Sequence, residues 1–319
     1  MPVVAEVVRG GFVEGHHHGS VIALRGDDTA LEIGRPDDPM LPRSCAKPLQ
    51  AAGMLRVGLD VDDELLAVVC ASHSGEDRHL AVVQRLLATA GLDETALDNT
   101  PGRPLDKAAR RAMTCAGRPA DAISHNCSGK HAGMLATCVA AGWPTDGYRD
   151  PLHPLQLALR DTIAELTGDT VTATVVDGCG APLYAVTLRG LARAFARLAA
   201  APPDSPEGRC ATAMRRHPEL VGGTGRDVTD LLTGVPDIVA KDGAEGVYVA
   251  ALPDGRAVAV KIDDGASRAR VPVLVAACRS VDIEAPALAD LATSPVLGHG
   301  ERVGEVRATF GAAATSGRS

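Results

Sequence analysis

Alternation of apolar and polar residues near both ends of the chain predicts β-strands. Toward the N-terminus, residues 3–14 (VVAEVVRGGFVE), 19–28 and 29–34 alternate and are separated by Gly and Asp, which predicts antiparallel strands joined by turns. Toward the C-terminus, residues 245–265 contain two such runs around the tripeptide Pro-Asp-Gly, the strongest hairpin signal in the sequence. Both ends of the chain are therefore expected to contribute strands.

Between these ends, apolar residues recur at intervals of three and four, which predicts helices. The predicted helices cover residues 46–58, 62–73, 77–91, 130–143, 154–168, 183–200 and, after the hairpin, 267–281. Strands at both termini with helices between them predict an α+β fold. In this fold an antiparallel sheet is built from N- and C-terminal strands and is flanked by helices.

The same pattern predicts how the chain is organised. Residues 1–305 are expected to form a single domain, with a helical region at about 75–215 inserted into the sheet. Small and polar residues in segment 306–319 predict a disordered tail.

Composition narrows the class of protein. The chain has 319 residues, of which 45% are hydrophobic, enough for a sizeable core. A net charge of −8 and an aromatic content of 2% argue against nucleic-acid binding, which uses basic stripes or stacking aromatics. Because we find no secretory signal and no apolar stretch of bilayer-spanning length, we expect a cytoplasmic protein without membrane contact. Its eight cysteines are then expected to be reduced.

Lysine is rare among the basic residues. Of the 32 Lys and Arg residues only five are lysines, namely Lys47, Lys107, Lys130, Lys241 and Lys261. Lysine can lose its proton inside a protein and arginine cannot, so each of these lysines is a candidate for chemistry. Lys107, which is flanked by arginines, is predicted to be an ordinary solvated residue.

Ser44 and Lys47 are three residues apart at a predicted helix start. Residues i and i+3 lie on one face of a helix, so the lysine amine can reach the serine hydroxyl. Free N–H groups at a first helical turn stabilise developing negative charge. The apolar sequence around Lys47 favours the uncharged amine that a base requires. The alternative interpretation is a serine cap followed by a solvated lysine.

Serine and lysine recur in three further segments. Ser72 and Ser74 follow an apolar helix and suit either a cleft wall or a helix cap. Lys261 ends a predicted strand, and a strand-end lysine facing a helix-start serine is typical of penicillin-recognising enzymes. The alternative is that Lys261 lies on an edge strand, where its charge prevents pairing with other chains. The glycine-rich segment 220–233 suits an anion cradle or a structural turn. Lys241 is predicted to be a turn residue that shapes the site.

Two cysteines lie in turns next to polar residues. Cys127 is followed by Lys130 and His131 at a helix start, and it is a candidate nucleophile, a candidate metal ligand or an inert buried thiol. Cys179 lies between two glycines after a predicted strand, close to Asp177. Two thiols in such turns favour a shared soft metal ion. Zinc suits thiolates best, with other groups or water completing its shell.

Seven motifs occur in the order typical of one family. They are RSCAKPLQ, ASHSGE, NCSGKHAGML, DGCGAP, GGTGRD, KDGAEGVY and VKIDDG. On these motifs the chain resembles the L-asparaginase II family of the Rhizobium etli type over nearly its whole length. The resemblance implies a fold similar to those of serine β-lactamases and glutaminases. It also implies hydrolysis of L-asparagine to L-aspartate and ammonia by a homodimer.

The resemblance further implies the roles of individual residues. Two Ser-Lys pairs would carry the catalysis, Ser44 with Lys47 and Ser72 with Lys261. One zinc ion per chain would be bound by Cys127, Lys130 and Cys179. The substrate pocket would be lined by Arg43, His131 and Asp177, with Arg43 holding the α-carboxylate.

Three alternatives to this activity remain. A β-lactamase or penicillin-binding enzyme shares the serine-lysine chemistry, but SHSGE and KIDDG replace its Ser-Asp-Asn and Lys-Thr-Gly elements. A cysteine amidase would use Cys127 with His131 and would not need Ser44. A zinc-stabilised amino-acid-binding module would bind asparagine without releasing ammonia.

Overall fold

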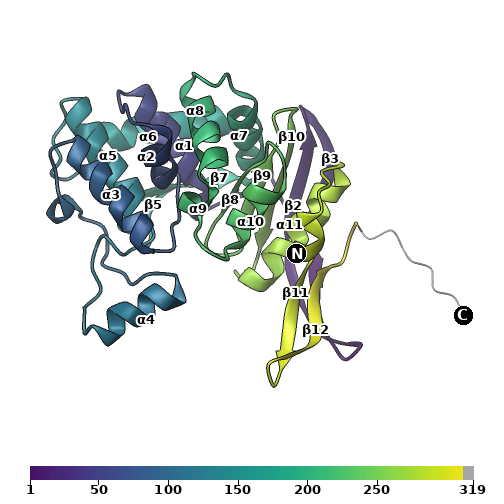
Figure 1. Ribbon diagram of the computed structural model, residues 1–319. Helices are drawn as coiled ribbons and strands as arrows, with labels where there is room; N and C mark the ends of the chain where they lie inside the picture. The colour runs from purple at the N-terminus through teal and green to yellow at the C-terminus, as the bar shows by residue number, and fades with distance from the viewer. Residues whose placement is uncertain (312–319) are drawn as a thin grey trace, which may run out of the picture.

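The computed structural model of the protein describes residues 1–311. Figure 1 shows the main β-sheet on one side of the molecule and most of the helices gathered on the other. Within the described residues this sheet has eight strands in the order β11-β12-β1-β2-β10-β9-β8, with β3 also paired to β2. Its strands are β1 (Val3–Arg9), β2 (Phe12–Arg25), β3 (Asp28–Ile33), β8 (Val239–Asp242), β9 (Val247–Ala251), β10 (Arg256–Ile262), β11 (Thr293–Gly298) and β12 (Glu301–Ala308).

The sheet confirms the predicted α+β architecture, because strands from the two termini pair side by side. Strand β1 pairs antiparallel with β12, with Val7 opposite Val306. Strands β9 and β10 form the predicted hairpin. Their side chains are almost all buried, and helices α7 (Leu188–Ala200) and α11 (Ser267–Ser280) pack against β10. The centre of the sheet is therefore part of the core.

Two features of the strands differ from the prediction. Strand β2 is continuous where a turn was expected between residues 14 and 19, because its first half pairs with β1 and its second half with β10 and β3. Strand β12 runs to Ala308, so the first three residues of the tail predicted from residue 306 belong to a strand. Pairing with β1 holds these largely exposed residues in place. The rest of the predicted tail, 312–319, lies outside the described residues.

Helices between residues 47 and 234 form the inserted region, which is longer than the predicted 75–215. Besides α7, they are α1 (Lys47–Arg56), α2 (Asp63–Val69), α3 (Asp77–Thr89), α4 (Lys107–Cys115), α5 (Ser128–Ala140), α6 (Pro154–Thr167), α8 (Pro206–Arg216), α9 (Pro218–Val221) and α10 (Asp227–Gly234). Strand β4 (Pro39–Met40) and the 3₁₀ turn η1 (Arg43–Ala46) precede this region, which also contains the 3₁₀ turn η2 (Glu94–Ala96) and the short strands β5 (Thr174–Val176), β6 (Pro182–Tyr184) and β7 (Val186–Thr187). Helix α12 (Ala287–Leu291) follows α11.

The helical region meets the sheet at its β8 edge. Turn η1, which leads into α1, packs against both β8 and β9. The loop after α2 and the start of α5 converge on the same place, because both contribute hydrogen-bond acceptors to the first residue of α1. The motifs of the sequence therefore meet at a junction between helices and sheet.

Among residues 1–311, the structure contains no helix with the length and apolar character needed to cross a membrane.

Candidate active site

Lys47 lies at the centre of this junction. It is the first residue of α1, and its side chain is only 2% exposed. Its Nζ lies 2.7 Å from the Ala71 carbonyl oxygen, 3.3 Å from that of Asn126 and 2.9 Å from Ser72 Oγ. The amine donates to all three oxygens; an uncharged amine that donated only to the two carbonyls would keep its lone pair for the Ser72 hydroxyl. The geometry thus suits a base.

The serine that contacts Lys47 is not the one next to it in the sequence. Among the described residues Lys47 forms a hydrogen bond with Ser72 and none with Ser44. Ser44 lies in the 3₁₀ turn η1, while the Ala71 and Asn126 carbonyls direct the amine toward the loop after α2. Ser44 is partly exposed and Ser72 is buried, so Ser44 is the more accessible of the two serines.

The strand-end lysine beside this site is Lys241, whereas the sequence indicated Lys261. Lys241 is fully buried on β8, and its carbonyl oxygen lies 3.1 Å from Cys45 Sγ in η1. A Cβ added to Gly243 would also lie 3.1 Å from that sulfur, so strand and turn are in close contact. Lys261 lies on β10, two strands away from β8, and its amine contacts the Ile262 carbonyl.

The Lys241 amine forms an ion pair with the neighbouring Asp242 carboxylate. Lys241 Nζ lies 2.7 Å from Asp242 Oδ1. Burial lowers the pKa of Lys241, the Asp242 carboxylate opposes this change, and the nearby Lys47 adds to it. Sequence reasoning placed Lys241 in a turn because Asp-Gly follows it. A signal that could have identified it is that the same Lys-Asp-Gly closes an apolar strand.

Cys127, Lys130 and Cys179 are brought together as predicted. Cys127 caps α5, Lys130 lies in its first turn, and Lys130 Nζ lies 3.1 Å from Cys179 Sγ. A hydrogen bond from Cys179 lowers the pKa of Cys127 well below its ordinary value against the effect of burial, and Lys47 and Lys130 contribute. For Lys130 burial lowers the pKa, but the two thiol groups outweigh it and raise the pKa. The cluster therefore favours the thiolate form of Cys127.

His131 lies deeper than its predicted place in the substrate pocket. Its side chain is fully buried, its Nδ1 lies 2.7 Å from the Tyr148 hydroxyl, and the two rings meet edge to face. Burial lowers its pKa to about 4, so the ring is neutral at physiological pH. Its Nε2 is buried and has no hydrogen-bond partner in the part of the chain that the structure describes.

Arg43 and Asp177, two of the predicted substrate-binding residues, form an ion pair. Arg43 Nε lies 2.9 Å from Asp177 Oδ1, and a second carboxylate, Glu245, lies 3.6 Å from the same guanidinium. Burial raises the pKa of Asp177, but Lys130, the Gly178 N–H and Arg43 together lower it by more. The net pKa is below its ordinary value, so the carboxylate stays ionised. Arg43 has a φ of 49°, a strained value for a residue with a side chain.

A family comparison connects these clusters with an activity. The model of a family described as L-asparaginase II matches residues 5–308, nearly the whole chain. The chain belongs to the L-asparaginase II family. It is therefore an amidohydrolase that acts on asparagine. A comparison with curated proteins finds no match.

The asparaginase has a donor set that fits zinc. Cys127, whose pKa is lowered, lies close to Cys179, and thiolate sulfur is the soft donor that zinc prefers; the Lys130 amine, 3.1 Å from Cys179 Sγ, could add a nitrogen ligand. The unpartnered Nε2 of His131 adds a fourth nitrogen or sulfur atom to this region. Within residues 1–311, no cluster of three or more His, Cys, Asp or Glu side chains is suited to a metal. Any zinc site here thus depends on the lysine.

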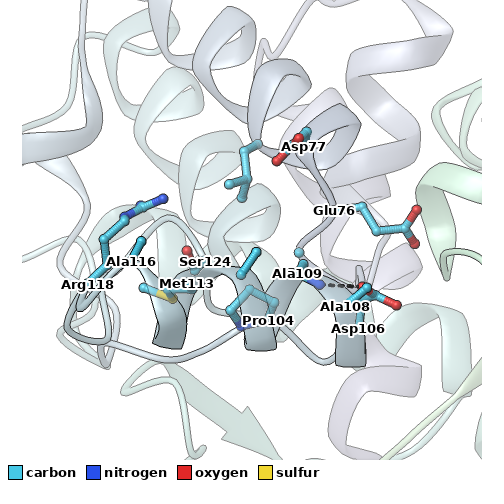
Figure 2. A pocket seen from close by; sticks show the side chains of 13 residues that line it. Glu76, Asp77, Pro104, Asp106, Ala108, Ala109, Met113, Ala116, Arg118 and Ser124 are labelled. Atoms are coloured by element: carbon cyan, nitrogen blue, oxygen red, sulfur yellow. Dashed lines mark hydrogen bonds between the residues drawn. The ribbon is translucent and has the colours of Figure 1, made fainter.

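A cleft of about 510 Å³ lies on the other side of the Ser72 loop of the asparaginase, between α3 and α4 (Figure 2). Leu80 and Met113 line it together with Glu76, Asp106 and Arg118. The predicted site residues are absent from its described lining, so this cleft is separate from the junction that holds Lys47.

Proposed function

We propose that the enzyme hydrolyses L-asparagine to L-aspartate and ammonia by acyl transfer through a serine, with Lys47 as the base. The observation that supports this most is the buried Lys47 amine, held by two carbonyls and 2.9 Å from the Ser72 hydroxyl. Ammonia released from asparagine by the purified protein, with glutamine as the comparison substrate, tests the activity.

Substrate recognition follows from the Arg43–Asp177 ion pair. A free amino acid carries an α-carboxylate, which can replace Asp177 as the partner of Arg43. It also carries an α-ammonium group, which can replace Arg43 as the partner of Asp177. Arg43 would then hold the carboxylate in a bidentate contact, and Asp177 the ammonium. We assign His131, which is fully buried, to the wall behind the pocket, where it orients Tyr148.

The chemistry begins with proton transfer from Ser44 to uncharged Lys47. Ser44 Oγ bonds to the side-chain carbonyl carbon of asparagine, and N–H groups at the start of η1, including that of Ser44, stabilise the oxyanion. Ser72, which already contacts the amine, passes the proton from Lys47 to the nitrogen as the C–N bond breaks and ammonia leaves. Water then cleaves the aspartyl ester, which releases aspartate and restores the Ser44 hydroxyl.

Lys241 takes the role that the sequence gave to Lys261. Its ammonium, stabilised by Asp242, disfavours a second positive charge on Lys47 and so keeps Lys47 available as a base. We expect Lys241→Met to lower kcat by about 100-fold or more, because the positive charge that opposes an ammonium at Lys47 would be lost. Lys261→Met is the matched control, and we expect its kcat to stay within about 3-fold of wild type. Steady-state ammonia release measures both; an equal loss in the two variants would contradict the assignment.

We propose that Cys127, Lys130 and Cys179 hold one zinc ion per chain, with water completing its shell. When bound, zinc would supply a fixed positive charge that orients the substrate and stiffens the pocket wall. The ligand cluster lies beside the Arg43–Asp177 pair, since Asp177 Oδ2 is 3.9 Å from Cys179 Sγ. By family resemblance, we also propose a cytoplasmic homodimer.

Loss of zinc is expected to weaken substrate binding more than catalysis. Cys179→Ala should lose the metal and raise KM by about 10-fold or more, with a smaller change in kcat, because the ion orients substrate and takes no part in bond making. Elemental analysis and steady-state kinetics measure both effects. Cys115→Ala, which changes an exposed cysteine of α4, should keep full zinc content. A Cys179→Ala protein with unchanged zinc would refute the ligand assignment.

A further inference from the structure

The glycine-rich segment 222–227 (GGTGRD) is bound tightly to the loop that carries Ser72. The Ser72 N–H donates to the Val221 carbonyl at 3.1 Å, and the Ser74 hydroxyl donates to the Gly222 carbonyl at 3.0 Å. Gly223 has a φ of 135°, and any Cβ there would collide with Ser74 Oγ. Only glycine allows this approach. The segment is thus built around the Ser72 loop.

Arg226, at the end of this segment, bridges the Ser72 loop and the Lys241 strand. Its Nη2 lies 2.6 Å from Asp242 Oδ2, while its Nη1 lies 3.5 Å from both the Ser72 carbonyl oxygen and Ser74 Oγ. Asp242 binds Lys241 through its other oxygen at 2.7 Å. One guanidinium therefore connects the backbone of the relay serine with the carboxylate that holds the second lysine.

The surroundings make this contact electrostatically strong. The side chains of Lys241 and Asp242 are 0% and 5% exposed. Burial raises the pKa of Asp242, but Lys241, Arg226 and Arg270 together hold it far below its ordinary value. Charges buried this deeply interact over several ångströms, because little water screens them.

We propose that Arg226 is a positioning residue of the asparaginase reaction, which holds the Ser72 backbone in place and shares the Asp242 carboxylate with Lys241. This inference rests on the proposed roles of Ser72 and Lys241. It assigns a function to the GGTGRD segment, for which the sequence pattern and the family match give no role.

The sharing of Asp242 predicts a change in pH dependence. The groups that surround the Lys241 amine are Asp242 on its own strand, Lys47 on α1, Cys45 on η1, Arg226 before α10, Arg270 on α11 with its partner Asp227, and Tyr248 on β9. Arg226 is a positive charge near Lys241 and competes with it for the Asp242 carboxylate. Without the Arg226 charge, the charged form of Lys241 is more stable, so Lys241 would keep its proton to higher pH. The alkaline limb of kcat, where Lys241 loses its charge and no longer holds Asp242 in place, would move to higher pH.

The test uses Arg226→Gln, Arg226→Lys and Arg78→Gln. Arg78 binds Glu76 and Thr224 on the exposed side of the same segment and contacts neither Ser72 nor Asp242 in the described structure, so it is a matched control. Arg226→Gln should lower kcat by about 10- to 100-fold, with KM within about 3-fold, and move the alkaline limb up by about 1 pH unit. Arg226→Lys keeps the charge and should lower kcat without moving the limb. Arg78→Gln should leave the limb in place.

The outcomes separate this inference from the proposed function. A uniform loss of kcat in Arg226→Gln with no shift of the limb, unchanged kinetics, or an equal shift in Arg78→Gln would each overturn it. If Arg226→Gln fails to fold, as thermal melting would show, Arg226→Lys must still lower kcat with an unshifted limb. Absence of ammonia release by the wild-type enzyme, or full activity of a Lys47→Arg variant, would instead overturn the proposed function.

Discussion

Lys47→Arg is expected to lower kcat for asparagine by about 10⁴-fold. Arginine keeps the positive charge and much of the length of lysine, but it does not give up its proton inside a protein. A base that cannot become neutral cannot accept the proton of Ser44, and loss of general-base catalysis typically costs 10²- to 10⁴-fold, with the upper end expected when the base also serves the leaving group. Ammonia release under saturating asparagine measures the effect.

Lys107→Arg is the matched control for this substitution. Lys107 is exposed at the start of α4, away from the site, so the same change of residue should leave kcat unaltered. Thermal melting would verify that the Lys47→Arg protein is folded, since a buried guanidinium is larger than the amine it replaces. A folded Lys47→Arg enzyme with full activity would show that Lys47 is not the base.

Ser44→Ala is expected to abolish the covalent intermediate and to lower kcat by about 10⁴-fold or more, because the hydroxyl that bonds to carbon is removed. Rapid acid quench of the wild-type enzyme during turnover, followed by peptide mass mapping, should locate an aspartyl ester on Ser44. Ser72→Ala should also slow turnover, but it keeps the attacking oxygen, so the ester should still form on Ser44.

The same experiment distinguishes the serine mechanism from a cysteine amidase. An adduct on Cys127, with Ser44→Ala fully active, would identify the thiol as the nucleophile. Ser205→Ala serves as a control, because Ser205 caps α8 through the Gly208 N–H, donates to the Pro202 carbonyl and has no contact with the site in the described structure. It should retain wild-type kcat and lose about 1 kcal/mol of unfolding free energy.

Much of the fold could be read from local patterns. The β9–β10 hairpin was predictable because its two strands are adjacent in sequence and the turn between them has a distinctive composition. The C-terminal hairpin of β11 and β12 was not predicted, because many of its side chains are exposed and its apolar pattern is weak. Pairing of β12 with β1, about 300 residues away in the chain, stabilises it.

Several site residues were also predictable from the sequence, because their chemistry is local. The short spacing of Cys127 and Lys130 at a helix start brings them into one turn, as the structure confirms. The rarity of lysine marked all five lysines as candidates for chemistry, and Lys47, Lys130 and Lys261 were given site roles, whereas Lys241 was predicted only to shape the site. These conclusions need only the residue type and a few neighbours along the chain.

The sequence by itself determined which residue types were available and on which elements they lie; the tertiary structure decided their partners. Lys47 contacts Ser72 in place of Ser44, and the strand that packs against η1 carries Lys241 and not Lys261. The physical reason is that a side chain's partner depends on which strand is at the edge of the sheet and which carbonyls surround the amine. Both follow from packing between segments far apart in the chain, about which spacing along the sequence carries no information.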